Sequence, residues 1–199
     1  TVQIHLSQAP YWASCPIAAF SSPQPERVAL SLNVGEHIHL AWSEPTGLTQ
    51  TLTVCGLDPQ LAQPQSWELP IPSPWAFVVD GEGWLHGVWG QGDAINYRSS
   101  SVATTATATL VAGVTVGQLS LALEDKALPH LAWSAPESAG QTAGIYYASL
   151  TGRVQPVQVA AGGHSPRLTM GPSGRAHLCW ITERGLHYAT SQDWTVSRV

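Results

Sequence analysis

One short phrase occurs four times along the chain, and it constrains the fold more than any other feature. Each copy begins with histidine and ends with tryptophan three residues later. The copies are His39–Trp42, His86–Trp89, His130–Trp133 and His177–Trp180. By their residue numbers, the histidines are 47, 44 and 47 residues apart. A recurrence at this period predicts an array of similar structural units.

The residues around each copy predict four short β-strands per unit. In the third unit, for example, the predicted strands cover residues 119–123, 129–133, 144–148 and 154–159. Such runs are rich in apolar and β-branched residues and are separated by Gly, Asn, Asp and Pro. No apolar pattern of helical spacing extends over three turns, so we expect almost no helix. We therefore predict an all-β fold, a β-propeller of four-stranded antiparallel blades.

The repeats predict one propeller domain over residues 1–199. The units cover about residues 1–22 (partial), 23–70, 71–114, 115–161 and 162–199. The first stretch, Thr1–Leu6, resembles the sequence before Trp42, with His5 in the place of His39, and further strands are expected near Tyr11–Ala13 and Ile17–Phe20. We predict five blades with the first incomplete. A four-bladed ring and an open part of a larger propeller are the alternatives.

The repeated phrase has a structural explanation. Side chains alternate between the two faces of a strand, so the histidine and the third residue share one face, and the second residue and tryptophan share the other. Each blade of a propeller is covered on both faces by its neighbours. We therefore expect each tryptophan to fill the space between adjacent blades. We expect each histidine to donate a hydrogen bond to a neighbouring loop carbonyl.

At the level of the repeat, the chain resembles the sialidase-like and lectin-like β-propellers. The segments that carry this resemblance best are Leu121–Ala148 and Leu168–Val196. The resemblance implies a fold only. Sialidases carry the motif Ser-x-Asp-x-Gly-x-x-Trp in several blades, and the segment Asp80–Trp84 approaches it without its spacing. Sialidase activity therefore does not carry over.

An acidic residue follows the repeated phrase in every full unit. These residues are Glu44, Asp93, Glu137 and Glu183. In propellers the loops between second and third strands usually line the face that carries the binding site. Four acids around one face would attract cations or basic partners. They are our first candidates for ligand binding.

A second group of candidates could bind carbohydrate. Aromatic rings stack on sugars, and loop carboxylates and amides hold the hydroxyl groups. The aromatic residues that we expect to be exposed are Trp75, Trp84, Tyr97 and Tyr147. Asp93 and Asn96 lie near Tyr97 in the sequence and could supply the polar contacts.

Other kinds of site find little support in the sequence. There is no Gly-x-Ser-x-Gly motif and no phosphate-binding loop. Asp80 and Glu82 could act as the carboxylate pair of a glycosidase, but they lie in a predicted tight turn. Equivalent histidines of different blades are spread around a ring, so we predict no metal site. The three cysteines include no Cys-x-x-Cys pair and do not define a compartment.

Charge argues against nucleic acid as a partner. Lys and Arg number only eight, and the net charge is −5, whereas nucleic-acid binding requires clustered positive charge. No apolar run approaches the roughly 18 residues that span a membrane. The chain begins with Thr1, so we expect either a processed protein or a piece of a longer one.

The sequence thus predicts a non-catalytic interaction module without a cofactor, which recognises a protein or a glycan through loops on one face. A propeller-type glycoside hydrolase or lyase is one alternative. A structural domain of a larger protein is the other.

Overall fold

We describe the fold from a computed structural model. It covers residues 2–8, 13–20, 27–32, 38–46, 49–56, 65–70, 73–101, 107–124, 128–138, 141–150 and 154–199. Within these ranges the chain forms strands, turns and irregular connections, and none of these residues lies in a helix. The chain divides into two compact units, Thr1–Pro72 and Ser73–Val199.

The first unit contains two antiparallel sheets. One is the pair β1 (Val2–Gln8) and β2 (Ala13–Phe20). The other has four strands in sequential order: β3 (Arg27–Leu32), β4 (Ile38–Thr46), β5 (Thr49–Gly56) and β6 (Gln65–Pro70). The second sheet contains the first copy of the repeated phrase, in β4.

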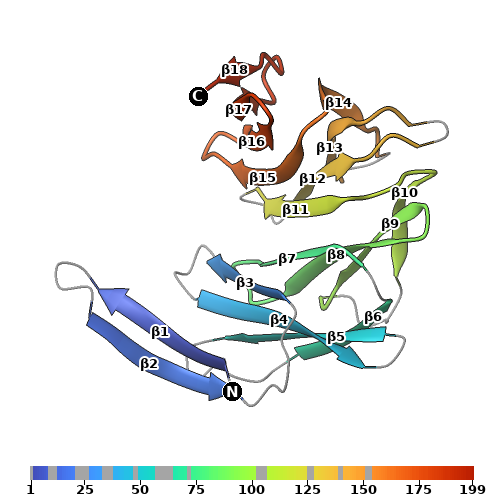
Figure 1. Ribbon diagram of the computed structural model, residues 1–199. Coiled ribbons are helices and arrows are strands. Elements are labelled where there is room, and N and C mark those ends of the chain that lie inside the picture. The colour runs from blue at the N-terminus through green and yellow to red at the C-terminus, as the bar shows by residue number, and fades with distance from the viewer. Residues whose placement is uncertain are drawn as a thin grey trace. The chain divides into compact units, whose positions relative to one another are not determined.

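The second unit contains three four-stranded antiparallel sheets, which follow one another in Figure 1 from green through yellow to red. The first is β7 (Trp75–Val79), β8 (Leu85–Gln91), β9 (Ala94–Ser99) and β10 (Ala108–Ala112). The second is β11 (Gln118–Leu123), β12 (Pro129–Ala135), β13 (Gly144–Ser149) and β14 (Val157–Ala161). The third is β15 (His164–Met170), β16 (Ala176–Thr182), β17 (Gly185–Thr190) and β18 (Ser197–Arg198).

The predicted fold class is confirmed: the protein is an all-β propeller with four-stranded antiparallel blades. The described residues form four such sheets and no fifth one. Residues 17–20, predicted as a separate strand, belong to the single long strand β2, while Tyr11 lies outside the described residues. The predicted strand from Trp194 is shorter than expected, because Trp194 has a φ of 52° and β18 begins at Ser197.

The core of the second unit lies between its sheets. The first strands of the three sheets are neighbours, since β11 packs against both β7 and β15. Leu131 and Trp133 face the preceding sheet, where they join Val88 and Ile95 in one apolar cluster. Ala132 faces the following sheet and belongs to a second cluster. The predicted alternation of β12 between two buried faces is therefore confirmed.

All four repeated tryptophans are buried, with exposed fractions of 7% or less. Trp180 repeats the placement of Trp133 one sheet further along, in the cluster with Ile145 and Val159 of the preceding sheet. Each of these two rings also stacks on a ring from the neighbouring strand. Trp133 lies on Tyr146, with the centroids 5.5 Å apart, and Trp180 lies on His187, at 5.7 Å. The inter-blade role predicted for the tryptophans is confirmed for Trp133 and Trp180.

The repeated histidines make a different contact from the predicted one. In each sheet of the second unit, Nδ1 of the histidine is hydrogen-bonded to a tyrosine hydroxyl of the third strand, not to a loop carbonyl. The pairs are His86–Tyr97 at 2.7 Å, His130–Tyr147 at 2.6 Å and His177–Tyr188 at 2.6 Å. Each tyrosine pairs in register with the residue two positions after the histidine. The two side chains therefore share a face and meet diagonally across the strands.

A carboxylate completes this contact in two of the sheets. Nε2 of His86 lies 3.1 Å from Asp80 Oδ2, and Nε2 of His130 lies 3.4 Å from Glu124 Oε2. Both acids stand at the end of the first strand, two residues beyond the partner of the histidine. In the last sheet Gly171 takes this position, and a Cβ there would lie 2.9 Å from Nε2 of His177. We call the arrangement in the first two sheets the acid–His–Tyr contact.

The acid–His–Tyr contact of β12 predicts how stability depends on pH. Burial lowers the pKa of His130, although Glu124 opposes the shift. Below about pH 6.5 the unfolded histidine therefore takes up a proton before the folded one, and stability falls with falling pH. Burial, with Glu124, raises the pKa of Tyr147 to about 12. The unfolded tyrosine ionises first above about pH 10, so stability also falls as the pH rises towards 12.

We expect urea unfolding at a series of pH values to separate the two effects. The His130→Asn variant should lose less stability than the unmodified protein between pH 7.5 and pH 5. The Tyr147→Phe variant should lose less stability than the unmodified protein between pH 9.5 and pH 11.5. Its loss of stability between pH 7.5 and pH 5 should match that of the unmodified protein. Identical pH profiles for the unmodified protein and both variants would contradict this assignment.

Candidate functional site at the loop edge

Three of the four predicted acids lie in corresponding connections of the second unit. Asp93 is in the two-residue turn between β8 and β9, and Glu183 is in the turn between β16 and β17. Glu137 is in the longer connection between β12 and β13. All three side chains are exposed. Since the three sheets run in the same order, these connections belong to the same edge of the unit, which we call the loop edge.

Hydrogen bonds join the first two of these connections through the segment that leads from one blade to the next. The amide of Val114, between β10 and β11, donates to the carbonyl oxygen of Asp93 at 2.8 Å. The next residue, Thr115, donates its amide to Oε1 of Gln141 at 2.8 Å. Gln141 belongs to the same connection as Glu137. The segment between β10 and β11 therefore holds both acidic connections at one edge.

A similar segment joins the second connection to the third. The amide of Gly162, between β14 and β15, donates to the carbonyl oxygen of Ala143 at 3.1 Å. Gly162 and Gly163 also line a pocket together with the turn that carries Glu183. The two segments that join consecutive blades, β10–β11 and β14–β15, thus each lie against the acidic connections of both blades that they join. The loop edge is continuous over the three sheets.

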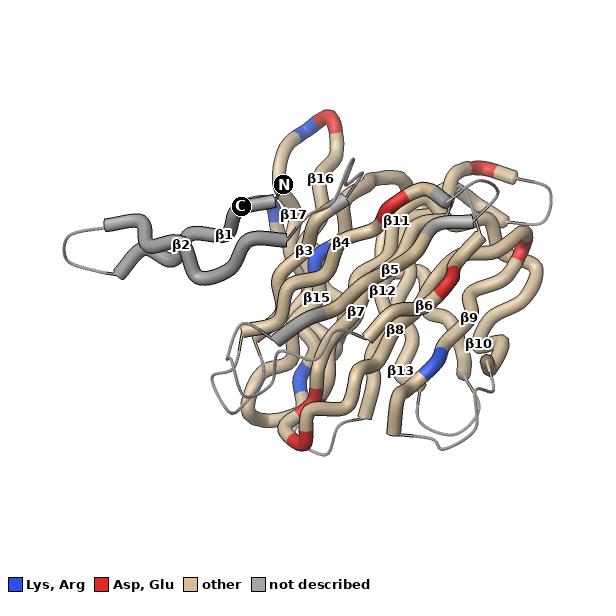
Figure 2. Tube along the Cα trace, turned by 90° about the horizontal axis from the view of Figure 1, so that it is seen from below, with Lys and Arg blue, Asp and Glu red and all other residues tan. Residues whose placement is uncertain are grey.

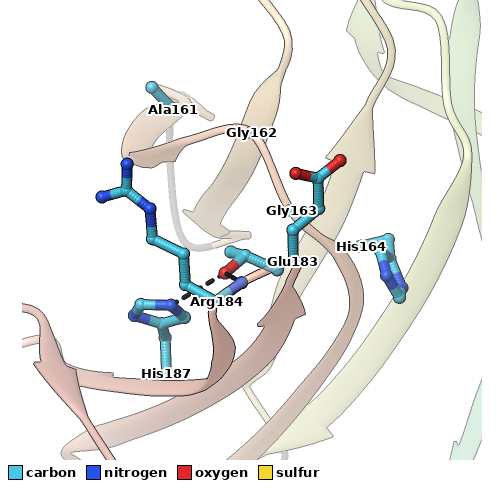
Figure 3. Close-up of a pocket in the computed structure, with 8 residues that line it drawn as sticks. Ala161, Gly162, Gly163, His164, Glu183, Arg184 and His187 are labelled. Atoms are coloured by element: carbon cyan, nitrogen blue, oxygen red, sulfur yellow. Dashed lines mark hydrogen bonds between the residues drawn. The ribbon is translucent and has the colours of Figure 1, made fainter.

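The pocket at the end of the loop edge has a volume of about 620 Å³ and opens to solvent. Its lining comes from the connection between β14 and β15 and from the β16–β17 hairpin (Figure 3). The lining residues are Ala161, Gly162, Gly163, His164, Thr182, Glu183, Arg184 and His187. Figure 2 shows one acidic and one basic position side by side at the tip of the β16–β17 turn.

Short-range hydrogen bonds shape the hairpin side of this pocket. The Thr182 hydroxyl accepts the amide hydrogen of Arg184 at 3.0 Å and also lies 2.9 Å from Nε2 of His187. His187 stacks on Trp180 with an angle of 17° between the rings. Gly185, with a φ of 114°, follows the turn in a conformation that favours glycine. The buried tryptophan of the repeated phrase thereby supports a ring in the pocket wall.

The glycine pair forms the other side. Gly162 and Gly163 have φ angles of 73° and 102°. A Cβ on Gly163 would lie 2.6 Å from Cδ1 of Trp180, whereas a Cβ on Gly162 would meet nothing within 4 Å. In the sequence, the pair stands only at the boundary between two predicted units, 115–161 and 162–199. Its close approach to Trp180 depends on the pairing of β15 with β16, which brings the connection before β15 beside the indole.

The fourth predicted acid, Glu44, belongs to the first unit and has a structural contact. It lies within strand β4, opposite Thr51, and not in the predicted loop. Its Oε1 accepts a hydrogen bond from the indole nitrogen of Trp42 at 2.9 Å. Its carboxylate is partly buried. Glu44 is therefore engaged with its own blade.

The aromatic candidates do not assemble into one stacking surface. The expectation that Trp75 is exposed is wrong, because its side chain is only 1% exposed. Tyr97 and Tyr147 are partly buried, and their hydroxyl groups are bonded to the repeated histidines. Trp84 is 41% exposed, but it lies directly before β8, whereas Asp93 lies after the end of β8. Trp84 and Asp93 therefore lie at opposite edges of the sheet.

The candidate carboxylate pair of a glycosidase lies at that opposite edge and has contacts of its own. Oδ1 of Asp80 accepts the amide hydrogens of Glu82 and Trp84, at 3.0 and 2.8 Å. Its Oδ2 contacts the repeated histidine of β8. Glu82 accepts the indole hydrogen of Trp84 at 3.0 Å. Both carboxylates stabilise the turn between β7 and β8.

The described residues contain no group of three His, Cys, Asp or Glu side chains placed to share a metal ion. Among the same residues there is also no helix of the length and apolarity that a membrane span requires.

Comparison with known proteins supports the fold. No family model and no curated protein matches the chain. Among solved structures, the chain is similar to TolB from Acinetobacter baumannii, with a TM-score of 0.54 and 14% sequence identity. The match covers 80% of this chain and 41% of the TolB chain, so this chain spans about two fifths of that length. At such low identity the likeness shows the β-propeller fold alone.

Proposed function

We propose that this protein is a non-catalytic interaction module that binds a protein partner through the loop edge of its second unit. The observation that carries the proposal is the line of exposed acids, Asp93, Glu137 and Glu183, on connections that hydrogen bonds hold together. Loops of a rigid β-scaffold can present such side chains without large ordering costs on binding. A carboxylate row of this kind favours a partner with a basic surface.

A protein partner has more support than a glycan. Stacking of a sugar calls for an accessible aromatic ring beside polar groups, which is why the aromatic residues were candidates for carbohydrate binding. Trp75 is buried, and the exposed ring of Trp84 lies at the opposite edge from the acids. The glycan proposal therefore lacks its stacking surface, while the charges required for a basic protein partner are in place.

Site-specific photo-crosslinking tests the proposal. A photoreactive amino acid at position 137, in the loop edge, is expected to give adducts with a basic protein in extracts of the source cells. The same group at position 82, on the opposite edge, serves as the matched control and should give none. Equal adducts from both positions would contradict a binding role for the loop edge.

The affinity for the crosslinked partner, measured after the charges of the loop-edge acids are removed, tests the same proposal quantitatively. The triple variant Asp93→Asn, Glu137→Gln, Glu183→Gln is expected to weaken binding of the crosslinked partner by about tenfold. Each exposed charge pair contributes roughly 0.2–1 kcal/mol, and 1.4 kcal/mol corresponds to a factor of ten. Glu82→Gln removes a charge at the other edge and should leave the affinity unchanged. An unaltered affinity of the triple variant would exclude the acids from the interface.

A further inference from the structure

The pocket at the end of the loop edge contains one acidic and one basic side chain. Glu183 and Arg184 are neighbours in the β16–β17 turn, and both side chains are exposed. Within the described residues, neither has an ion-pair partner. Figure 3 shows their side chains diverging, with the carboxylate on one side of Gly163 and the guanidinium on the other.

Each charge has a histidine on its side of the pocket. The ring of His187 lies below the Arg184 side chain, and the ring of His164 lies on the side of Glu183 (Figure 3). Both rings belong to the pocket lining. Between them, the glycine pair leaves the wall without side chains, so a ligand can approach the backbone closely. The pocket is thus divided into a side that suits an anion and a side that suits a cation.

This division determines which ligands the pocket favours. With neutral histidines, the formal charges of the lining cancel, since it contains one carboxylate and one guanidinium. A purely anionic ligand is attracted by Arg184 but repelled by Glu183, and a purely cationic ligand experiences the reverse. A ligand that carries both charges satisfies both groups. Arg184 can form two parallel hydrogen bonds to a carboxylate, which adds directional preference.

We propose that this pocket binds a dipolar peptide, with its carboxylate at Arg184 and its ammonium group at Glu183. His187 and His164 flank the two ends, and the Gly162–Gly163 backbone faces the middle of the ligand. This inference rests on the proposed binding role of the loop edge and specifies one ligand class for its last pocket. The adjacent acids Asp93 and Glu137 lie in other connections and are not required for it.

Titration of the full chain with short glycine peptides tests the proposal, with two-dimensional NMR as the readout. The probes are di-, tri- and tetraglycine with free termini, and the same peptides after N-acetylation, C-amidation or both. We expect a free peptide to shift the signals of the pocket residues saturably. Blocking either end should weaken binding about two- to fivefold, as expected for the loss of one exposed ion pair.

Two variants assign each end of the peptide to its side chain. In Arg184→Gln, C-amidation should no longer weaken binding, while N-acetylation still should. In Glu183→Gln the preference should be reversed. Glu82→Gln is the matched control, because it removes an acidic charge at the opposite edge and should leave both preferences unchanged.

The outcomes separate this inference from the proposed function. Absence of saturable binding, or equal binding of free and blocked peptides, would overturn the dipolar site. If crosslinking at position 137 still depends on the loop-edge acids in that case, the interaction module stands and only its pocket ligand is wrong. Binding that depends on the carboxylate alone would identify an anion site and would equally overturn the proposal.

Discussion

Replacing Trp133 by alanine is expected to lower the free energy of unfolding by about 3–5 kcal/mol, the usual cost of truncating a buried tryptophan. The side chain is 0% exposed and belongs to the cluster between the first and second sheets of the second unit. Its ring also stacks on Tyr146. Alanine would leave a cavity at a junction where rigid sheets on both sides resist collapse. Urea unfolding monitored by far-ultraviolet circular dichroism measures the loss.

Two further variants make this prediction specific to burial between blades. Trp84→Ala removes an exposed ring of the opposite edge, so its cost should be less than about 1 kcal/mol. Trp133→Phe keeps an aromatic ring in the cluster and removes an indole N–H that has no hydrogen-bond acceptor among the described residues. It should cost less than half as much as Trp133→Ala. Equal losses for Trp84→Ala and Trp133→Ala would refute the inter-blade role.

The Gly163→Ala substitution is expected to destabilise the protein by about 2–4 kcal/mol. Two effects combine, because a φ of 102° is unfavourable for an alanine and its Cβ would lie 2.6 Å from Cδ1 of Trp180. The indole belongs to the rigid cluster between two sheets, so it has little room to move. Any shift of Trp180 would also displace His187, which stacks on it. The pocket should therefore lose its shape together with the stability.

Gly162→Ala is the matched control for this prediction. Gly162 also has a positive φ, of 73°, but a Cβ there would meet no atom within 4 Å. Its cost should be limited to backbone strain, about 1–2 kcal/mol. Urea unfolding gives both values, and NMR signals of the His187 ring report on the pocket. If the two variants were equally stable, steric contact with Trp180 could not be the reason for the glycine at position 163.

Much of the fold follows from local patterns. The period of the His-x-x-Trp phrase and the alternation of apolar residues predict four-stranded blades with buried Trp133 and Trp180, because strand geometry fixes which side chains share a face. The N-terminal residues were predicted less well. Pro16 favours a break before residues 17–20, but the strand continues through it as β2, with a register shift where its partner His5 pairs with it.

The candidate site was predictable only in part. The recurrence of an acid after each Trp indicated Asp93, Glu137 and Glu183, because equivalent loops of successive repeats lie at one edge. The exposure of Trp75 was predicted wrongly, since its side chain is buried, as are those of Phe77 and Val79 on the same face of β7. Composition alone cannot distinguish a buried aromatic ring from a binding surface.

The sequence by itself determined the repeat, the class of fold and the acidic connections, because each of these depends on chain period and on strand alternation. Only the tertiary structure decided which side chains contact one another. Tyr147 contacts His130 because of the register between β12 and β13. The wall of the pocket beside Glu183 includes Gly163, which lies close to Trp180 of β16. These contacts depend on how strands and sheets are placed against one another, so no local pattern of residues contains them. The repeated phrase thus specifies the scaffold, and the packing around it forms the pocket of the candidate site.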